Sequence, residues 1–175
     1  MGGNTKSSYL ALVPKEANHI TFNRFKPISL CNSSYKIITK LVANIIKKVL
    51  PQIISQNQGD FVPNRQIIDN VIIVQEAVHS SIQKQDKGMI VKLDMANAFD
   101  RVSHPYLMVV LQKLGFLEEI TGVIQACIST PWIPPLINGR PSDFFQSTRG
   151  LRQGYPLSPF LYIIKAETLC RALEA

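Results

Sequence analysis

The fold class depends most on the stretch VKLDMANAFDRV, residues 91–102. Val91 and Leu93 alternate with Lys92 and Asp94, so a strand here would end at a carboxylate on the face opposite the apolar side chains. Such a carboxylate can hold a divalent cation. Asp94 also directly precedes MANAFDRV, so it can instead be a helix N-cap, a position in which Asp is favoured. The spacing alone favours this N-cap interpretation over the metal-binding one. Both interpretations leave open which group is the partner of Asp94.

Composition points to a globular protein with a polyanionic partner. Of the 175 residues, 46% are apolar and 18% are charged, which fits one domain or slightly more. The net charge of +7 favours nucleic acid first and an anionic membrane surface second, although a soluble domain can also be basic without such a partner.

The cysteines and the lack of targeting signals predict the compartment. Cys31, Cys127 and Cys170 show neither a disulfide framework nor the paired spacing of a zinc site, so reduced thiols are expected. No uncharged apolar stretch reaches the roughly 18 residues of a membrane span, and no signal peptide opens the chain. We therefore expect an intracellular, soluble protein, either nuclear or cytoplasmic.

Residue periodicity predicts an α+β fold, with helices packed on short antiparallel strands. Strands are expected over 9–15 and 89–94, and a hairpin around Asn138–Gly139. Helices are expected over 32–50, 67–83, 105–114, 118–129 and 157–173. Asn32, Ser33 or Ser34 can cap the first helix, and Pro51 is expected to help end it.

Apolar spacing also predicts which helix faces are buried. The expected stripes are Tyr35, Ile38, Leu41 or Val42, Ile45 and Val49 in the first helix; Ile68, Val71, Ile72, Val78 and Ile82 in the second; and Leu157, Leu161, Ile164, Thr168 and Ala172 in the last. Glu167 falls on the expected polar side of the last helix.

A second stretch that can carry chemistry is RGLRQGYPLSPF, residues 149–160. Its two glycines let the backbone approach a phosphate or a base, while Arg149 and Arg152 supply positive charge. Taken alone, such a loop is equally typical of an ordinary surface turn.

Together, LDMANAFDRV and NGRPSDFFQSTRGLRQGYPLSPFLY resemble the reverse transcriptases of LINE-type, non-LTR retrotransposons, especially the plant-like variety. The upstream segments LALVPK, RFKPISLCNSSYKIITKLVANIIKKVLPQIISQNQGDFVPNRQIIDN and VQEAVHSSIQ agree in order and spacing, so the resemblance covers about 8–173. It implies a right-hand polymerase fold, with a fingers-like region at 1–88, a partial palm at 89–175, and the 132–150 hairpin at their junction. It also implies an RNA-directed DNA polymerase that uses an RNA template, a DNA primer, deoxynucleotides and Mg²⁺.

The resemblance assigns roles to particular residues. Asp94 becomes the catalytic, metal-binding carboxylate, helped by the Met95 backbone carbonyl, and this interpretation now outweighs the helix cap. Phe99 would lie under the sugar of the incoming nucleotide, although it can also be simply a core aromatic. The implied nucleotide-binding residues are Lys15, Lys26, Ala98, Phe99, Gln153 and Gly154, and the implied template-binding residues are Gln58, Phe61, Arg65, Arg149 and Arg152.

Some positions depart from the family pattern. Lys26 stands where Arg is more frequent, Asn64 where Gly is usual, and Tyr155 where Asp or Cys is usual. The Tyr155 ring would either crowd its loop or point outward. Arg24 and Asn97 are further departures.

The family's palm continues after the last helix into a Tyr-x-Asp-Asp hairpin, which supplies the remaining metal-binding carboxylates. The 175 residues contain no adjacent pair of Asp, and neither Asp100, Asp143 nor Glu167 is placed to substitute. We therefore expect a fragment without a second carboxylate for Asp94, inactive on its own and prone to self-association through the 157–173 helix. The alternatives are a non-catalytic, basic module that binds RNA or template–primer, and a translated remnant without function.

Overall fold

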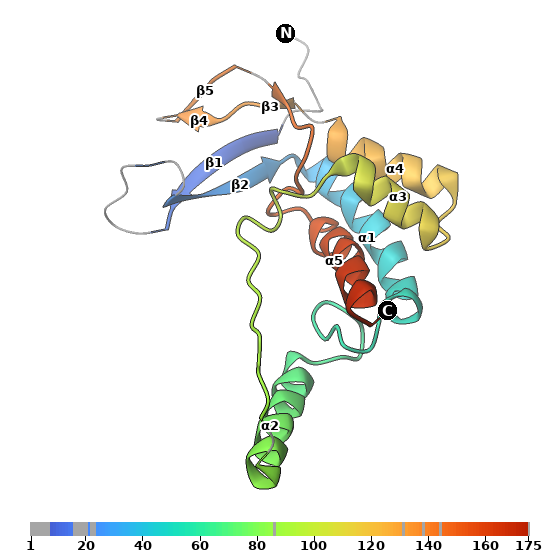
Figure 1. Ribbon diagram of the computed structural model, residues 1–175. Helices are drawn as coiled ribbons and strands as arrows, with labels where there is room; N and C mark the ends of the chain where they lie inside the picture. Colours follow the sequence, from blue (N-terminus) through green and yellow to red (C-terminus); the bar gives the residue numbers. More distant parts are fainter. Residues whose placement is uncertain are drawn as a thin grey trace.

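The structure is a computed structural model that describes residues 8–15, 21, 24–85, 87–130, 132–137, 139–143 and 145–174. Helices and short antiparallel strands alternate irregularly along these residues, so the predicted mixture of helices and short strands is confirmed. The N-terminal ribbon and the small strand pairs lie on one side, and the helices α1, α3, α4 and α5 cluster on the other (Figure 1).

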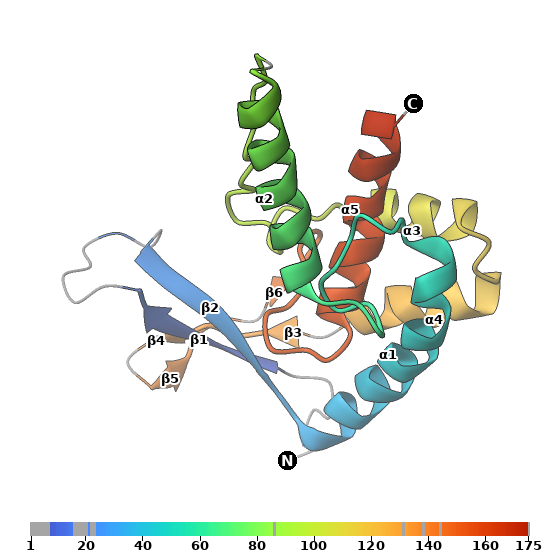
Figure 2. The same cartoon turned by 90° about the horizontal axis from the view of Figure 1, so that it is seen from below.

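The longest strands form a two-stranded ribbon. β1 (Ser8–Pro14) pairs antiparallel with β2 (Phe25–Cys31), in a register that runs from Ser8 opposite Cys31 to Pro14 opposite Phe25. The ribbon extends away from the helical cluster, as Figure 2 shows from below. Lys15 and Lys26 lie near the end of the ribbon at which Pro14 pairs with Phe25.

Two minor strand pairs accompany the ribbon. β3 (Trp132–Ile133) pairs with β6 (Phe145–Gln146), and β4 (Leu136–Ile137) pairs with β5 (Arg140–Pro141). The Leu10 amide donates to the Pro134 carbonyl at 3.1 Å, which fixes this region beside β1. The β4–β5 pair confirms the predicted hairpin, whose tip residue Asn138 lies outside the described residues.

Four helices enclose the hydrophobic core: α1 (Ser33–Ile53), α3 (His104–Lys113), α4 (Glu118–Ser129) and α5 (Ser158–Glu174). The Asn32 side chain accepts from the Tyr35 amide at 2.8 Å, so Asn32 is the N-cap of α1. Among the fully buried core side chains are Ile46, Leu50, Leu107, Leu111, Ile124, Leu157, Leu161 and Ile164.

The buried face of α1 differs from the predicted one. Thr39, Val42, Ala43, Ile46 and Leu50 are buried. Of the predicted stripe, only Val42 is buried, whereas Ile38, Leu41 and Ile45 are exposed. Both stripes have helical spacing and both are apolar, so the contacts with α5 and the core decide between them.

Pro51 does not end α1, because the helix continues to Ile53. Proline removes one amide donor and crowds the carbonyl four residues earlier, a cost that is lower near a C-terminus, where few turns follow. The Ile54 amide still donates to the Leu50 carbonyl at 3.0 Å and closes the last turn.

The helix α2 (Ile67–Lys84) lies apart from the other helices (Figure 1). It is a helix as predicted, but it has no buried side chain, so the predicted buried stripe from Ile68 to Ile82 is wrong. The described residues 87–95 form no strand, and Val91 and Leu93 are exposed. A strand needs a hydrogen-bonded neighbour, and the described strands pair elsewhere, which explains why the strand expected over 89–94 is absent.

The buried face of α5 was predicted in part. Leu161 and Ile164 are buried as expected, but Glu167 is buried too, with only 2% of its surface exposed. Leu157, at the start of the region expected to associate with another copy, is also buried. The core-facing side of this helix is therefore covered within the chain, whereas Leu169 and Leu173 farther along α5 are exposed, and self-association through 157–173 stays a prediction.

Within the described part of the chain, no helix combines the length and the apolar character that crossing a bilayer requires.

Ile45 and Ile46 provide a matched test of the α1 face, because Ile45 is 53% exposed and Ile46 is fully buried. Ile46→Ala should lower the free energy of unfolding by about 2–5 kcal/mol, through lost burial and a cavity. Ile45→Ala should change it by no more than ~0.5 kcal/mol. Urea unfolding of both variants checks this, and equal losses would contradict the observed face.

Candidate nucleotide-binding cleft

Backbone hydrogen bonds tie the basic loop 149–154 to two distant segments. The Gly150 amide donates to the Val102 carbonyl at 2.7 Å, and the Leu151 amide donates to the Phe99 carbonyl at 2.8 Å. On its other side, the loop accepts from β2, since the Ser29 amide donates to the Gln153 carbonyl at 3.0 Å. Three segments far apart in sequence thus meet through their main chains.

Gly150 makes this approach possible. Its φ is +90°, and a Cβ on it would lie 2.9 Å from the Asp100 carbonyl oxygen, closer than side chains normally come. His104, the first residue of α3, is buried and donates its ring Nε2 hydrogen to the Gly150 carbonyl at 2.8 Å. His104 was not among the residues predicted at the site, and the only signal for it in the sequence is a polar ring immediately after Val102 and Ser103.

The loop, β2 and the turn at 96–101 enclose a cleft of about 660 Å³. Four residues predicted at the nucleotide line it together: Lys26, Phe99, Gln153 and Gly154. A neighbouring hollow of about 540 Å³ shares Lys26 and Gln153 and adds Lys15, along with Asn97 and Asp100. The two hollows therefore form adjoining compartments, and the second carries two of the predicted cationic side chains.

The walls of the cleft are shaped by Gly154 and Phe99. Gly154 has φ +100°, and a Cβ there would lie 3.2 Å from the Ser29 carbonyl oxygen, so a side chain would strain this wall. The Phe99 ring stacks on Tyr162 of α5, with ring centroids 5.0 Å apart and an interplanar angle of 17°. Tyr162 thus fixes the orientation in which Phe99 faces the cleft.

Tyr155 points inward and supports the loop from below. Its hydroxyl is hydrogen-bonded to the Ser8 hydroxyl, and its ring lies 5.6 Å from that of Tyr35. Burial raises the pKa of Tyr155, partly opposed by the Ser8 hydrogen bond and Arg152, and burial raises the pKa of Tyr35 to about 12. Tyr155 therefore packs in the interior of the protein and does not point outward, although it stands where the family usually has Asp or Cys.

Arg152 is buried beside Tyr155, with its guanidinium carbon 5.4 Å from the ring centroid. It lines the cleft together with Gln153. Arg149 is exposed and lines a smaller hollow of about 260 Å³, which Arg152 also lines. The two arginines predicted at the template thus differ, since only Arg149 is freely accessible from the surface.

Comparison with known proteins identifies the family. The sequence profile described as "Reverse transcriptase (RNA-dependent DNA polymerase)" matches residues 13–175. The chain belongs to the reverse transcriptase family. This confirms the retrotransposon reverse transcriptase class predicted from the sequence.

Relatives of this reverse transcriptase chain come from transposable elements. It is 32% identical over 162 residues to the "Transposon TX1 uncharacterized 149 kDa protein" of Xenopus laevis, covering 93% of this chain and 12% of that protein. It is 26% identical over 164 residues to a "Retrovirus-related Pol polyprotein from type-1 retrotransposable element R2" of Popillia japonica, covering 91% of this chain and 22% of that protein. The R2DM polyprotein of Drosophila melanogaster is 26% identical, with 93% and 15% covered. The chain thus spans a small part of each relative.

The metal-binding carboxylate expected in a reverse transcriptase, Asp94, lies exposed in the extended segment 87–95, and it is not among the residues that line the two hollows. Ala98 is half-buried in the turn at 96–101, and the Met95 sulfur accepts from the Tyr162 hydroxyl at 3.4 Å. Across the described residues, no three His, Cys, Asp or Glu side chains gather where they could hold a metal ion. The donors present therefore do not fit a two-ion magnesium site, and Asp94 as a metal ligand stays a prediction.

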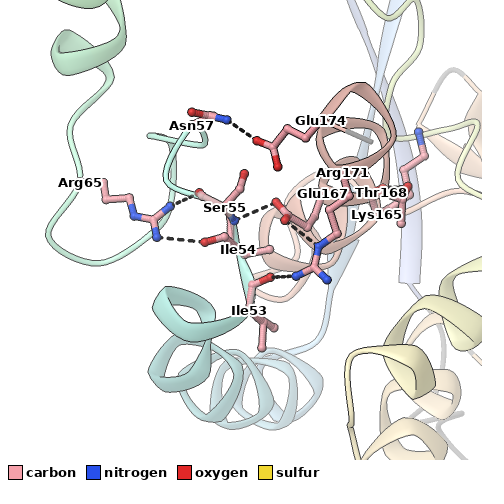
Figure 3. Close-up of polar contacts among 10 residues, drawn as sticks. All are labelled: Ile53, Ile54, Ser55, Asn57, Arg65, Lys165, Glu167, Thr168, Arg171 and Glu174. Atoms are coloured by element: carbon pink, nitrogen blue, oxygen red, sulfur yellow. Dashed lines mark hydrogen bonds and ion pairs between the residues drawn. The ribbon is translucent and has the colours of Figure 1, made fainter.

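The remaining predicted template residues lie in the loop 54–66, away from the cleft. Phe61 is exposed, whereas Gln58 is half-buried. Arg65 directs its terminal nitrogens at the backbone of its own loop, donating to the carbonyls of Ile54 at 3.1 Å and of Ser55, which Figure 3 shows. It also donates to the Gln58 carbonyl at 3.0 Å. A phosphate contact by Arg65 would have to compete with these bonds, so its observed role is to close the loop.

Gly150 and Gly115 separate steric contact from backbone conformation at the site. Both have positive φ, but an added Cβ meets nothing within 4 Å at Gly115. Gly115→Ala should cost about 1–2 kcal/mol for the left-handed conformation alone. Gly150→Ala should cost about 1–3 kcal/mol more, because the Asp100 backbone must move.

Chemical denaturation of the two glycine variants measures the difference. A Gly150→Ala variant as stable as Gly115→Ala would show that the close approach to Asp100 is absent in solution.

Proposed function

We propose that this chain forms the nucleotide- and template-binding part of an RNA-directed DNA polymerase encoded by a retrotransposon. Its substrates would be deoxynucleotides, an RNA template and a DNA primer. The observation that carries the proposal is the meeting of Lys26, Phe99, Gln153 and Gly154, drawn from three distant segments, at one cleft. Membership in the reverse transcriptase family supports the same chemistry.

The two compartments suit the two ends of a nucleotide. Lys15 and Lys26 at the second hollow offer ammonium groups to the triphosphate, as point charges and without the fork of an arginine. Phe99, held by Tyr162, offers an apolar wall to the sugar in the larger cleft. Gly154 has no side chain, so it leaves room in the cleft beside Phe99. The Gln153 side chain can donate a hydrogen bond to a base or sugar.

The proposed right-hand architecture divides the chain at residues 88 and 89. In this assignment the β1–β2 ribbon and α1 belong to the fingers-like region, and α3 to α5 belong to the partial palm. The extended connection that follows α2 in Figure 1 is consistent with a division there. The β3–β6 and β4–β5 pairs would lie at the junction.

Magnesium is proposed on family grounds, with Asp94 and the Met95 carbonyl as the ligands this chain contributes. When bound, a pair of such ions would activate the primer hydroxyl and stabilise the leaving pyrophosphate. Two oxygens from one exposed segment do not complete that geometry. The chain's own contribution is therefore to bind and orient the nucleotide and the template.

Lys26 tests the nucleotide site, with Lys40 as a matched control. Lys26 lines both hollows, whereas Lys40 is exposed on α1 and lines neither. Lys26→Gln should weaken binding of a deoxynucleoside triphosphate with Mg²⁺ by roughly threefold to tenfold, because a charge-assisted contact is lost. Lys40→Gln should leave it within about twofold at moderate salt, where distant charges are screened. Calorimetric titration decides, and equal effects would remove the cleft as the site.

Primer extension tests the role of Asp94. The 175-residue chain should not extend a DNA primer on an RNA template, because a paired-ion site needs more carboxylates than Asp94 supplies. Asp94→Asn should then show the same lack of extension. Extension that Asp94→Asn abolishes would show a complete metal site in this chain.

A further inference from the structure

The carboxylate of Glu167 is an unusual feature of α5, because it is buried in mid-helix. It is 2% exposed and lies on the same face as Ile163 and Ile164. A buried carboxylate is costly unless charged and polar groups bind both of its oxygens. The Ser55 amide donates to Oε2 at 3.0 Å, and Arg171 Nε donates to Oε1 at 3.0 Å.

Arg171 extends this contact to the end of α1. Its Nη2 donates to the Ile53 carbonyl at 2.8 Å while its Nε holds Glu167 (Figure 3). The last carbonyls of a helix lack partners within the helix and favour a cation. Glu167 and Arg171, named the α5 pair below, therefore fix the point at which the chain leaves α1 and enters the loop 54–66.

The same loop is closed on itself by Arg65, as described above. Asn70 of α2 donates to the Asn57 carbonyl at 3.0 Å, and Asn57 donates to Glu174 of α5 at 2.6 Å. Both ends of the loop are thus held by side chains, and the α5 pair attaches the N-terminal end to the core.

The loop has a strained conformation that needs such support. Phe61 has φ +57° and Asn64 has φ +62°, and the left-handed region costs a residue with a side chain about 1–2 kcal/mol. Asn tolerates this region better than other residues do, which explains Asn64 where the family usually has Gly. Phe61 is 52% exposed, so the loop holds an aromatic ring at the surface.

An exposed ring on a fixed loop is suited to stacking with an unpaired base. We propose that Glu167 and Arg171 are positioning residues that hold the loop 54–66 so that Phe61 stacks on unpaired nucleotides of an RNA template. The inference rests on the proposed function for its ligand, but not for the attachment of the loop. Preorganisation is the physical basis, since a loose loop would have to be ordered again at each binding event.

Two substitutions distinguish an effect on the position of the loop from an effect of net charge on nucleic-acid binding. Glu167→Gln raises the net charge by one, so long-range electrostatics alone would tighten binding to nucleic acid. Arg171→Lys keeps the charge but cannot hold Glu167 and Ile53 with one planar fork. Glu119→Gln is the matched control, because Glu119 is exposed in the first turn of α4 and its loss changes the charge equally.

The probe is a fluorescein-labelled RNA–DNA hybrid, either blunt or with an unpaired RNA overhang, titrated at low salt with each variant of the full chain. The unaltered chain and Glu119→Gln should prefer the overhang. Glu167→Gln, Arg171→Lys and Phe61→Ala should each reduce this preference by roughly fivefold or more, the loss expected for one stacked base. Glu167→Gln combined with Phe61→Ala should lose no more than Phe61→Ala alone.

Hydrogen exchange without nucleic acid measures the attachment itself. Peptides covering 54–66 should exchange on the order of tenfold faster in Glu167→Gln and Arg171→Lys, because charge-assisted bonds are lost. Peptides from α3 and α4 should be unchanged. If Glu167→Gln exchanges throughout the chain, it has unfolded, and Arg171→Lys, altered at a partly exposed residue, decides the outcome.

The outcomes distinguish the two proposals. An overhang preference that survives both substitutions, with the loop still protected, overturns the positioning role. If the loop exchanges faster but the preference for the overhang is unchanged, the α5 pair only stabilises the loop. That result also overturns the positioning role. An unaltered chain that binds neither hybrid refutes the proposed function and the template part of this inference, while hydrogen exchange still establishes whether the α5 pair holds the loop.

Discussion

The structure depends most on the close backbone contact between the loop 149–154 and the turn around Asp100. Two main-chain hydrogen bonds and the His104 ring hold this contact, and a third main-chain bond joins the loop to β2. It forms only because Gly150 has no side chain at a place where a Cβ would lie 2.9 Å from a carbonyl oxygen. Without it, Phe99 would not be held against Gln153 and Gly154, and the ribbon that carries Lys26 would lose one of its contacts with the rest of the chain.

This constraint explains why polar groups are buried below the cleft. Arg152 lies within the fixed loop and Tyr155 follows it directly, and the Tyr155 phenol reaches Ser8 of β1 and Tyr35 of α1 while the Arg152 guanidinium lies beside the phenol ring. Burial favours the neutral phenol, in agreement with the raised pKa of Tyr155. The positive charge of Arg152 thus lies in the buried lining of the cleft, while Lys15 and Lys26 are exposed and supply the accessible charge.

The sequence predicted the existence of the elements better than their environment. The helices, the Asn32 cap and the β4–β5 hairpin follow from local signals that act within a few residues. The burial of particular side chains does not follow from local signals. The segment IITKLVANIIKKVL, residues 37–50, carries apolar residues on two faces of the helix, and only packing against the core determines that Ile46 is buried and Ile45 is not. The alternating segment around Val91 predicted a strand, but a strand also requires a partner, which periodicity cannot supply.

The family resemblance, and not the spacing, predicted that four residues would lie together at the nucleotide site: Lys26, Phe99, Gln153 and Gly154. Spacing along a chain does not show which loops meet. Glu167 was missed for a different reason. A charged residue in a helix normally marks the solvent face, and the one contrary signal was Arg171, a cation four residues later, next to the apolar pair Ile163–Ile164.

The helix α5 connects the two regions proposed to bind nucleotide and template. Ser158 and Pro159 at its start line the cleft, and Glu167 and Arg171 near its end hold the loop that carries Phe61. Glu167 lies nine positions after Ser158 in the helix, about 13.5 Å along its axis at 1.5 Å per residue. Leu161 and Ile164 between them are fully buried, so α5 cannot slide or turn without disrupting a close-packed core. A rigid helix of fixed length therefore sets the distance between the proposed nucleotide site and the proposed template loop. This is a geometric coupling and requires no switch between conformations, because one packed arrangement serves both sites.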